Sequence, residues 1–153
     1  MSGVREVRAQ VFVHATEERE RVLKALMEIF PEEVRGEVRI EEERLEGHYG
    51  NPIVKIVARV EGEAAVKTFE HILSRLSRID RQALRGTLED RVDKEGTLYM
   101  RLSKQDAFLG GLTLYEADDV IRITIHFQGR RRAALSAYEE ALRGPEGGER
   151  LST

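Results

Sequence analysis

The sequence predicts an α+β protein in which helices pack on one face of a mostly antiparallel sheet. Apolar and polar residues alternate over several short stretches, as in half-buried strands: 7–14, 38–46, 53–60 and 120–127. Two longer segments, 62–78 and 130–143, place apolar residues three and four positions apart, which is typical of helices. The link between 38–46 and 53–60 is too short for a crossover helix, so these strands are expected to be antiparallel neighbours.

The first half of the chain is expected to run strand, helix, strand, strand, helix. Thr16 follows the first strand and is suited to cap a helix, whose dipole Glu17 and Glu18 complement. Pro31 ends that helix, because proline lacks a backbone N–H and clashes with the preceding turn. Two strands and the helix over 62–78 follow.

A β-hairpin is the most informative expected feature of the second half. Strands at 88–93 and 97–102 flank the turn residues DKEG, with apolar side chains on one face. The remaining expected elements are helical turns at 79–85 and 104–109, strands at 112–115 and 120–127, and the helix at 130–143. Together they form a single domain over residues 1–143, and the polar segment 144–153 is expected to be a disordered tail.

Composition indicates a folded, ionic protein and excludes several kinds of site. Of the 153 residues, 41% are hydrophobic and 35% are charged, which is typical of ion-pair-rich thermophile surfaces. The chain contains no cysteine, which excludes disulfides, thiolate metal sites and cysteine nucleophiles. No apolar run reaches the roughly 20 residues of a membrane helix, and no signal peptide is evident, so we expect a cytoplasmic protein.

The net charge of −3 is unevenly distributed along the chain. Residues 1–70 carry 11 basic and 15 acidic side chains, whereas residues 71–132 carry 12 basic and 9 acidic ones. A local basic patch of this size can engage a few phosphates. It does not support strong, length-independent binding of a polyanion.

The outward face of the expected hairpin, with the residues just after it, carries the side-chain types of a nucleic-acid contact. Guanidinium, ammonium, phenol and amide groups gather there: Arg91, Tyr99, Arg101, Lys104 and Gln105. Arginine and lysine bind phosphates, and an exposed tyrosine can stack on an unpaired base. The alternative interpretation is a solvated face whose charges serve solubility.

The segment GHYGNPI at 47–53 is a second candidate contact. Its glycines and proline fit a demanding β-turn between two strands. A rigid turn also presents side chains, and we expect His48, Tyr49 and Asn51 to stack on a base or read its edge.

Arg130, Arg131 and Arg132 form a third candidate contact at the start of the last helix. Positive charges at a helix N-terminus oppose the helix dipole, so these arginines do not stabilise that helix. The conflict favours a phosphate-binding role for them.

Enzyme motifs are absent from the sequence, including the nucleophile elbow, the zinc-protease motif, the P-loop and the dinucleotide fingerprint. His14 and His126 fall on expected strands and could meet across the sheet, but neither belongs to a metal-ligand motif. We therefore expect no enzyme, no cofactor and no metal. An enzyme would need a pocket in which one of these histidines, or a carboxylate, has a strongly perturbed pKa.

Four segments in combination resemble a known family: VFVHATEERERVLKAL (11–26), GHYGNPI (47–53), LEDRVDKEGTLYMRLSKQDAFLG (88–110) and DDVIRITIHF (118–127). They are similar to an archaeal family of small RNA-binding proteins whose members are described as predicted exosome-associated subunits. The resemblance covers residues 4–130 and implies RNA binding without catalysis, in the cytoplasm of an archaeon. It also implies a fold like that of the large-subunit ribosomal protein that binds 5S rRNA.

Two functions remain open at this point. The first is a non-catalytic RNA-binding protein that acts with the RNA-processing machinery, with the exosome as a candidate partner. The second is a protein-interaction subunit with little RNA affinity of its own. Glu41–Glu43 separate the two, because carboxylates that face the same way as the arginines would largely cancel phosphate attraction. The sequence specifies neither the RNA nor the oligomeric state.

Overall fold

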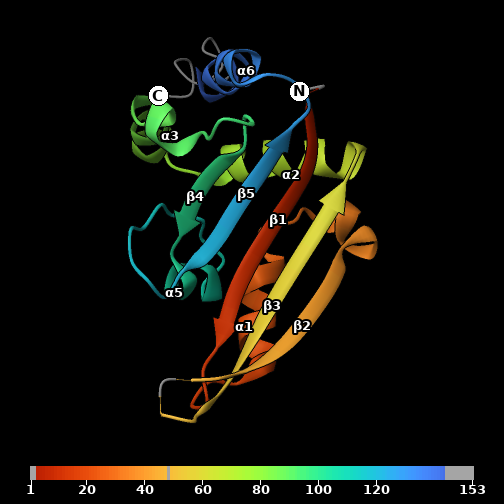
Figure 1. Cartoon of the computed structure of the whole chain (residues 1–153), viewed down its shortest axis with the longest axis vertical. Helices are drawn as coiled ribbons and strands as arrows, with labels where there is room; N and C mark the ends of the chain where they lie inside the picture. Colours follow the sequence, from red (N-terminus) through yellow and green to blue (C-terminus); the bar gives the residue numbers. More distant parts are fainter. Residues whose placement is uncertain (1–2, 48, 144–153) are drawn as a thin grey trace.

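The computed structural model describes residues 3–47 and 49–143, which contain one five-stranded sheet. The strand order is β2-β3-β1-β5-β4, and every neighbouring pair is antiparallel. Figure 1 shows β1 at the centre, with β2 and β4 at the two edges. The strands are β1 (Val4–Val13), β2 (Arg39–Glu46), β3 (Pro52–Glu61), β4 (Leu98–Leu102) and β5 (Ile121–Phe127).

The helices leave one face of the sheet open. In Figure 1, α1 and α2 lie behind the sheet, where they contact β1 and β3, and no helix of residues 3–47 or 49–143 crosses the front. Helix α6 packs against α3 and α4. The helices are α1 (Arg19–Met27), the 3-10 helix η1 (Glu32–Glu37), α2 (Glu63–Arg75), α3 (Arg78–Gly86), α4 (Leu88–Arg91), α5 (Lys104–Phe108) and α6 (Arg131–Arg143). Within the described residues, none is long and apolar enough to span a membrane.

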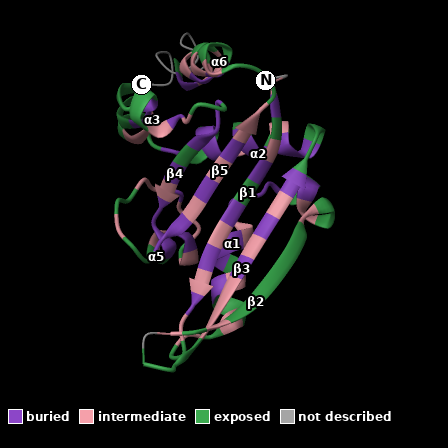
Figure 2. Cartoon of the chain, in the orientation of Figure 1, coloured by how far each residue is buried: buried purple, intermediate pink, exposed green. Residues whose placement is uncertain are grey.

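The predicted fold class is confirmed: the molecule is α+β, with an antiparallel sheet and helices on one of its faces. The strands bury alternate residues because successive side chains point to opposite faces. Val7, Ala9 and Val11 of β1 are fully buried, whereas Arg8 and Gln10 between them are not. Figure 2 shows this alternation along the central strands, and shows β2 exposed over most of its length. The likeness to the 5S rRNA-binding ribosomal protein stays a prediction.

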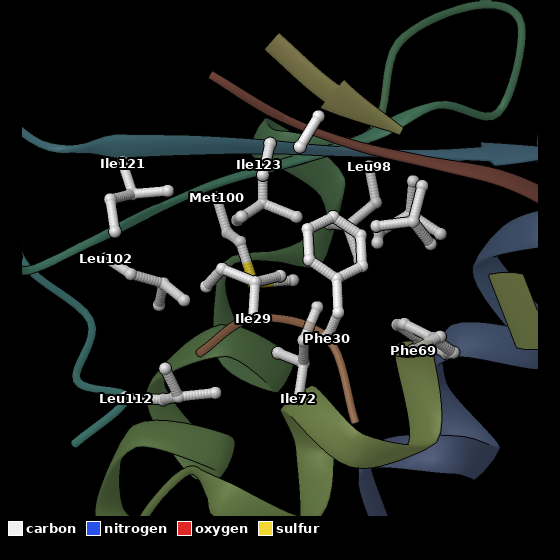
Figure 3. Close-up of a cluster of buried hydrophobic side chains, with 14 of the residues drawn as sticks. Ile29, Phe30, Phe69, Ile72, Leu98, Met100, Leu102, Leu112, Ile121 and Ile123 are labelled. Carbon is white, nitrogen blue, oxygen red and sulfur yellow. The ribbon is translucent and has the colours of Figure 1, made fainter. Parts of the chain in front are cut away.

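The hydrophobic core lies between the sheet and the helices behind it. Figure 3 shows Ile29 and Phe30, which follow α1, beside Ile72 of α2 and close to Met100 and Ile123 of the sheet. All five are at most 1% exposed. This core occupies the helix-covered face only, so the side chains of the other face remain available for contacts.

The segment 88–93 forms a helical turn, where the sequence predicts a strand. Leu88–Arg91 forms α4, and only Val92 makes a β-bridge, to Leu98. The apolar residues that predict the strand, Leu88 and Val92, are four positions apart. One turn of helix accommodates that spacing as well as a strand does, so the pattern alone is ambiguous.

Two helix boundaries also differ from prediction. Glu18, and not Thr16, occupies the N-cap of α1, and no side chain caps this helix. The helix expected over 62–78 ends at Arg75. A separate helix, α3, begins at Arg78, because the hydroxyl of Ser77 accepts the backbone N–H of Asp80 at 3.0 Å and caps the new helix.

The segment 112–115 makes a single bridge, between Leu114 and Leu102, in place of the predicted strand. Backbone bonds flank this bridge, from the Ser103 N–H to the Thr113 carbonyl at 2.8 Å and from the Tyr115 N–H to the Arg101 carbonyl at 3.0 Å. The N–H of Leu114 itself donates to the Asp80 carboxylate at 3.0 Å. The predicted tail, 144–153, lies outside the described residues.

Candidate nucleic-acid interface

The open face of the sheet forms a groove of about 1270 Å³. Its charged and aromatic lining comes from all five strands and includes Arg8, Glu41, Lys55, Tyr99, Arg101 and Arg122. In β1, β3, β4 and β5 these side chains point away from the helices, because their neighbours along the strand face the core. Glu41 of β2 shares their face because it pairs with Val57 of β3. Tyr99 and Arg101, which the sequence predicts as RNA contacts, therefore do lie together.

Strand pairing aligns the groove side chains in rows that cross the sheet. One row consists of Glu41, Val57, Gln10, Arg122 and Arg101, one residue from each strand. The adjacent row consists of Arg39, Arg59, Arg8, Thr124 and Tyr99. The first row thus carries two guanidinium groups at its β4–β5 end and a carboxylate at its β2 end.

Arg101 and Arg122 are cross-strand neighbours that each bond to a backbone carbonyl of the loop before β5. Arg101 Nη1 donates to the Ala117 oxygen at 3.1 Å, and Arg122 Nη2 donates to the Asp118 oxygen at 3.3 Å. Each guanidinium has five N–H donors, so most remain for other acceptors. Because like charges opposite each other repel, an anion bound between them would relieve the repulsion.

Arg91 lies at the rim of the groove, on α4. Its Nε donates to the Thr87 hydroxyl at 2.7 Å, and its Nη2 pairs with the Glu116 carboxylate at 3.1 Å. Glu116 already neutralises this arginine, so we expect Arg91 to attract phosphate less than Arg101 does.

Tyr99 presents an oriented aromatic ring, and the residue is 46% exposed. Its hydroxyl donates to one Asp93 oxygen at 2.9 Å, and this bond raises the pKa of Tyr99 above its ordinary value. The other Asp93 oxygen accepts the backbone N–H groups of Glu95 and Thr97, both at 2.9 Å. The ring is therefore held from its hydroxyl end, while nearly half of the residue is open to solvent.

Lys104 is buried, where the sequence predicts an exposed phosphate contact. Its side chain is 4% exposed, and its ammonium group donates to the Phe12 carbonyl at 2.7 Å and to Glu17 at 2.9 Å. Asp119 accepts a third bond at 3.2 Å. Since its ammonium group already donates to these three acceptors, Lys104 stabilises the end of β1 and does not line the groove. Gln105, next to it on α5, is exposed but lies outside the groove.

The 47–53 loop lies beyond the groove, at the tip of the β2–β3 hairpin. Tyr49 is 85% exposed, and together with Asn51 and His14 it lines a smaller hollow of about 240 Å³. His48 lies outside the described residues. Gly50 has a φ of +79°, which supports the demanding turn that the sequence predicts.

The three arginines at the start of α6 do not line the groove. Arg131 is tied to the preceding segment, since it donates to the carbonyls of Val92 at 3.3 Å and Glu89 at 2.9 Å. Arg130 and Arg132 are exposed. The structure therefore separates this candidate contact from Tyr99 and Arg101.

Sequence reasoning missed Arg8, Gln10 and Arg122 as members of the site. The signal was present, because each alternates with buried residues of its strand and so must face away from the core. Their position beside Arg101 depends on the pairing of β1 with β5 and of β5 with β4, which the local pattern does not specify.

His14 directly follows β1 and His126 lies on β5, opposite Glu6, so the two histidines do not meet. His14 lies 3.2 Å from Asp119, and His126 lies 3.8 Å from Glu6. Within residues 3–47 and 49–143, no group of three or more histidine and carboxylate side chains is arranged to hold a metal ion.

These features define a class of protein: an α+β domain whose open sheet face carries adjacent arginines and an oriented tyrosine, as polynucleotide-contacting surfaces do. The chain belongs to the RNA-binding family, whose model, described as RNA binding, matches residues 6–127. An RNA-binding protein of Pyrococcus abyssi is 37% identical over 145 residues, which cover 92% of this chain and 94% of that protein.

Solved structures of archaeal proteins share the fold. The crystal structure of a DUF54 family protein from Archaeoglobus fulgidus is similar with a TM-score of 0.76 and 30% identity, over 90% of this chain and 98% of that one. A DUF54 protein from Methanothermobacter thermautotrophicus has the same TM-score of 0.76 at 26% identity, over 92% of this chain and 98% of that one.

Proposed function

We propose that the protein binds RNA on the open face of its sheet and catalyses no reaction. Phosphates contact Arg8, Arg101 and Arg122, and Tyr99 stacks on a base. The pair Arg101 and Arg122 carries this proposal: within the described residues these two groove arginines have no carboxylate partner, whereas Arg8 pairs with Glu6.

The carboxylates of β2 do not cancel this attraction. Glu41 and Glu43 line the same groove as the arginines, which is the arrangement that weakens phosphate binding. However, β2 and β5 are separated by three strand spacings, or about 14 Å. The Debye length at physiological salt is about 8 Å, so the carboxylates are largely screened from a phosphate at Arg122.

Family membership and the Pyrococcus abyssi relative, which is named an RNA-binding protein, support RNA as the ligand. We extend the proposal to a cytoplasmic protein that acts with the RNA-processing machinery, with the exosome as the candidate partner that the sequence resemblance implies.

Fluorescence anisotropy with labelled single-stranded and duplex RNA, measured across a salt series, tests the proposal. Four to six phosphate contacts predict a log–log salt slope of roughly −3 to −5. Arg101→Ala should weaken binding and reduce the slope by about one unit. Arg130→Ala is the matched control, because it removes an exposed guanidinium outside the groove. It should change neither the affinity for RNA nor the salt slope.

Two results would refute the groove as the RNA site. One is the absence of binding to either RNA at low salt. The other is a reduced slope for Arg130→Ala together with an unchanged slope for Arg101→Ala.

Docking of a partner protein is the second candidate function. It is favoured by the mixed charge of the groove, where Glu41 and Glu43 stand opposite Arg101 and Arg122. A protein surface with complementary charges could engage both sides, whereas RNA phosphates engage only the basic side.

A further inference from the structure

The row that crosses the whole sheet has opposite charges at its two ends. Arg101 and Arg122 stand at the β4–β5 end, and Glu41 stands at the β2 end. Between them lie Val57 and Gln10, an apolar side chain and an amide. A nucleotide laid along this row with its phosphate on the arginines would place its base over Val57 and Gln10, with the far edge of the base toward Glu41.

Glu41 is the β2 carboxylate that remains available on this face. Glu43, two residues along on the same face, pairs with Lys55 at 3.4 Å. Glu42 faces the helix side, where its carboxylate accepts from Nε of Arg19 at 3.0 Å. Glu41 is exposed and, within the part of the chain that the structure describes, makes neither an ion pair nor a side-chain hydrogen bond.

We propose that Glu41 reads the Watson–Crick edge of an unpaired base and selects guanine. This inference rests on the proposed RNA-binding function and adds its specificity. A carboxylate has two acceptor oxygens and no donor, so it matches an edge with adjacent donors. The guanine edge offers N1–H and the N2 amino group side by side, whereas the single N–H of uracil lies between two carbonyl oxygens that repel a carboxylate.

The ligand class follows from this chemistry. In a duplex, the Watson–Crick edge is already occupied by the opposite base, so Glu41 can read only a single strand, a loop or an unpaired end. The groove therefore selects single-stranded RNA that contains guanine, with phosphate affinity on the β4–β5 side and base selection on the β2 side.

The test uses anisotropy with two 12-nucleotide RNAs that are uridine except at one central position. That position holds guanosine in one RNA and inosine, which lacks the N2 amino group, in the other. The wild-type protein should prefer the guanosine RNA by about tenfold, the size of a good carboxylate–base contact. Glu41→Gln should abolish the preference, because an amide no longer offers two acceptors.

Glu43→Gln is the matched control, since it removes the same charge from the same face of the same strand and should retain the preference. The proposal is overturned if the wild-type protein shows no preference, or if Glu41→Gln keeps it. It is also overturned if Glu41→Gln raises the affinity for both RNAs equally, because Glu41 would then act only as a charge that repels the RNA. Failure of the wild-type protein to bind either RNA would instead refute the RNA-binding function itself.

Discussion

The ammonium group of Lys104 lies 2.9 Å from a carboxylate oxygen of Glu17, and this partly buried ion pair joins α5 to the loop that follows β1. The same Glu17 oxygen accepts the backbone N–H of His14 at 2.8 Å. Lys104 therefore organises the end of the central strand, whereas the sequence predicts it to be a phosphate contact.

Lys104→Met should destabilise the fold by about 3 kcal/mol, because it removes the charged donor that binds the carboxylate of Glu17 and the carbonyl of Phe12. Urea denaturation measures the loss in the free energy of unfolding. Lys94→Met, in the exposed turn before β4, serves as the control and should change stability little. Unchanged stability together with weakened RNA binding would show that Lys104 contacts RNA and does not stabilise the fold.

Tyr99→Ala should weaken binding of single-stranded RNA by about 1–3 kcal/mol, the value of one stacked base. Tyr99→Phe keeps the ring and loses only the bond to Asp93, so its affinity should stay close to that of the wild-type protein. Anisotropy at constant salt makes the comparison. Tyr115→Ala, which removes a 55% exposed ring outside the groove, should have no effect. An equal loss for the Phe and Ala variants of Tyr99 would argue against stacking.

Asp93 should stabilise the protein at neutral pH and lose this contribution in acid. Burial opposes the charged form, but the N–H of Thr97, the hydroxyl of Tyr99 and the N–H of Glu95 outweigh it, so the pKa of Asp93 is lowered from its usual 3.8. A lowered folded-state pKa means that the contribution is complete above the unfolded pKa and disappears as the pH falls through the folded one.

The free energy of unfolding of wild-type protein and Asp93→Asn, followed from neutral pH to below 3.8, tests this expectation. The variant should be less stable by about 1–2 kcal/mol at neutral pH, and the difference should shrink in acid. A difference that does not depend on pH would show that the carboxylate charge is unimportant to the turn.

Tyr138→Phe should cost about 1 kcal/mol. The buried hydroxyl donates to the Gly96 carbonyl at 2.7 Å and thereby anchors the turn before β4 to α6. Thermal denaturation measures the change, and Tyr115→Phe, at an exposed position, provides the comparison. Equal stability of the two variants would mean that water replaces the lost bond.

The outward position of Tyr99 and Arg101 could be predicted from sequence because it depends on local alternation. Each lies between residues that must be buried, Leu98, Met100 and Leu102, and a strand has only two faces. The segment at 88–91 could not be resolved in the same way, because its apolar spacing suits a helix and a strand alike.

The sequence by itself determined the fold class and the faces of the strands, since hydrophobic periodicity acts over a few residues. Only the tertiary structure decided which polar residues meet. The β2-β3-β1-β5-β4 order brings Arg122 beside Arg101 and places Glu41 at the other end of their row. It also buries Lys104 against Glu17 across a separation of 87 residues. Such contacts join residues that are far apart in the sequence, so a pattern that spans only a few residues cannot predict them.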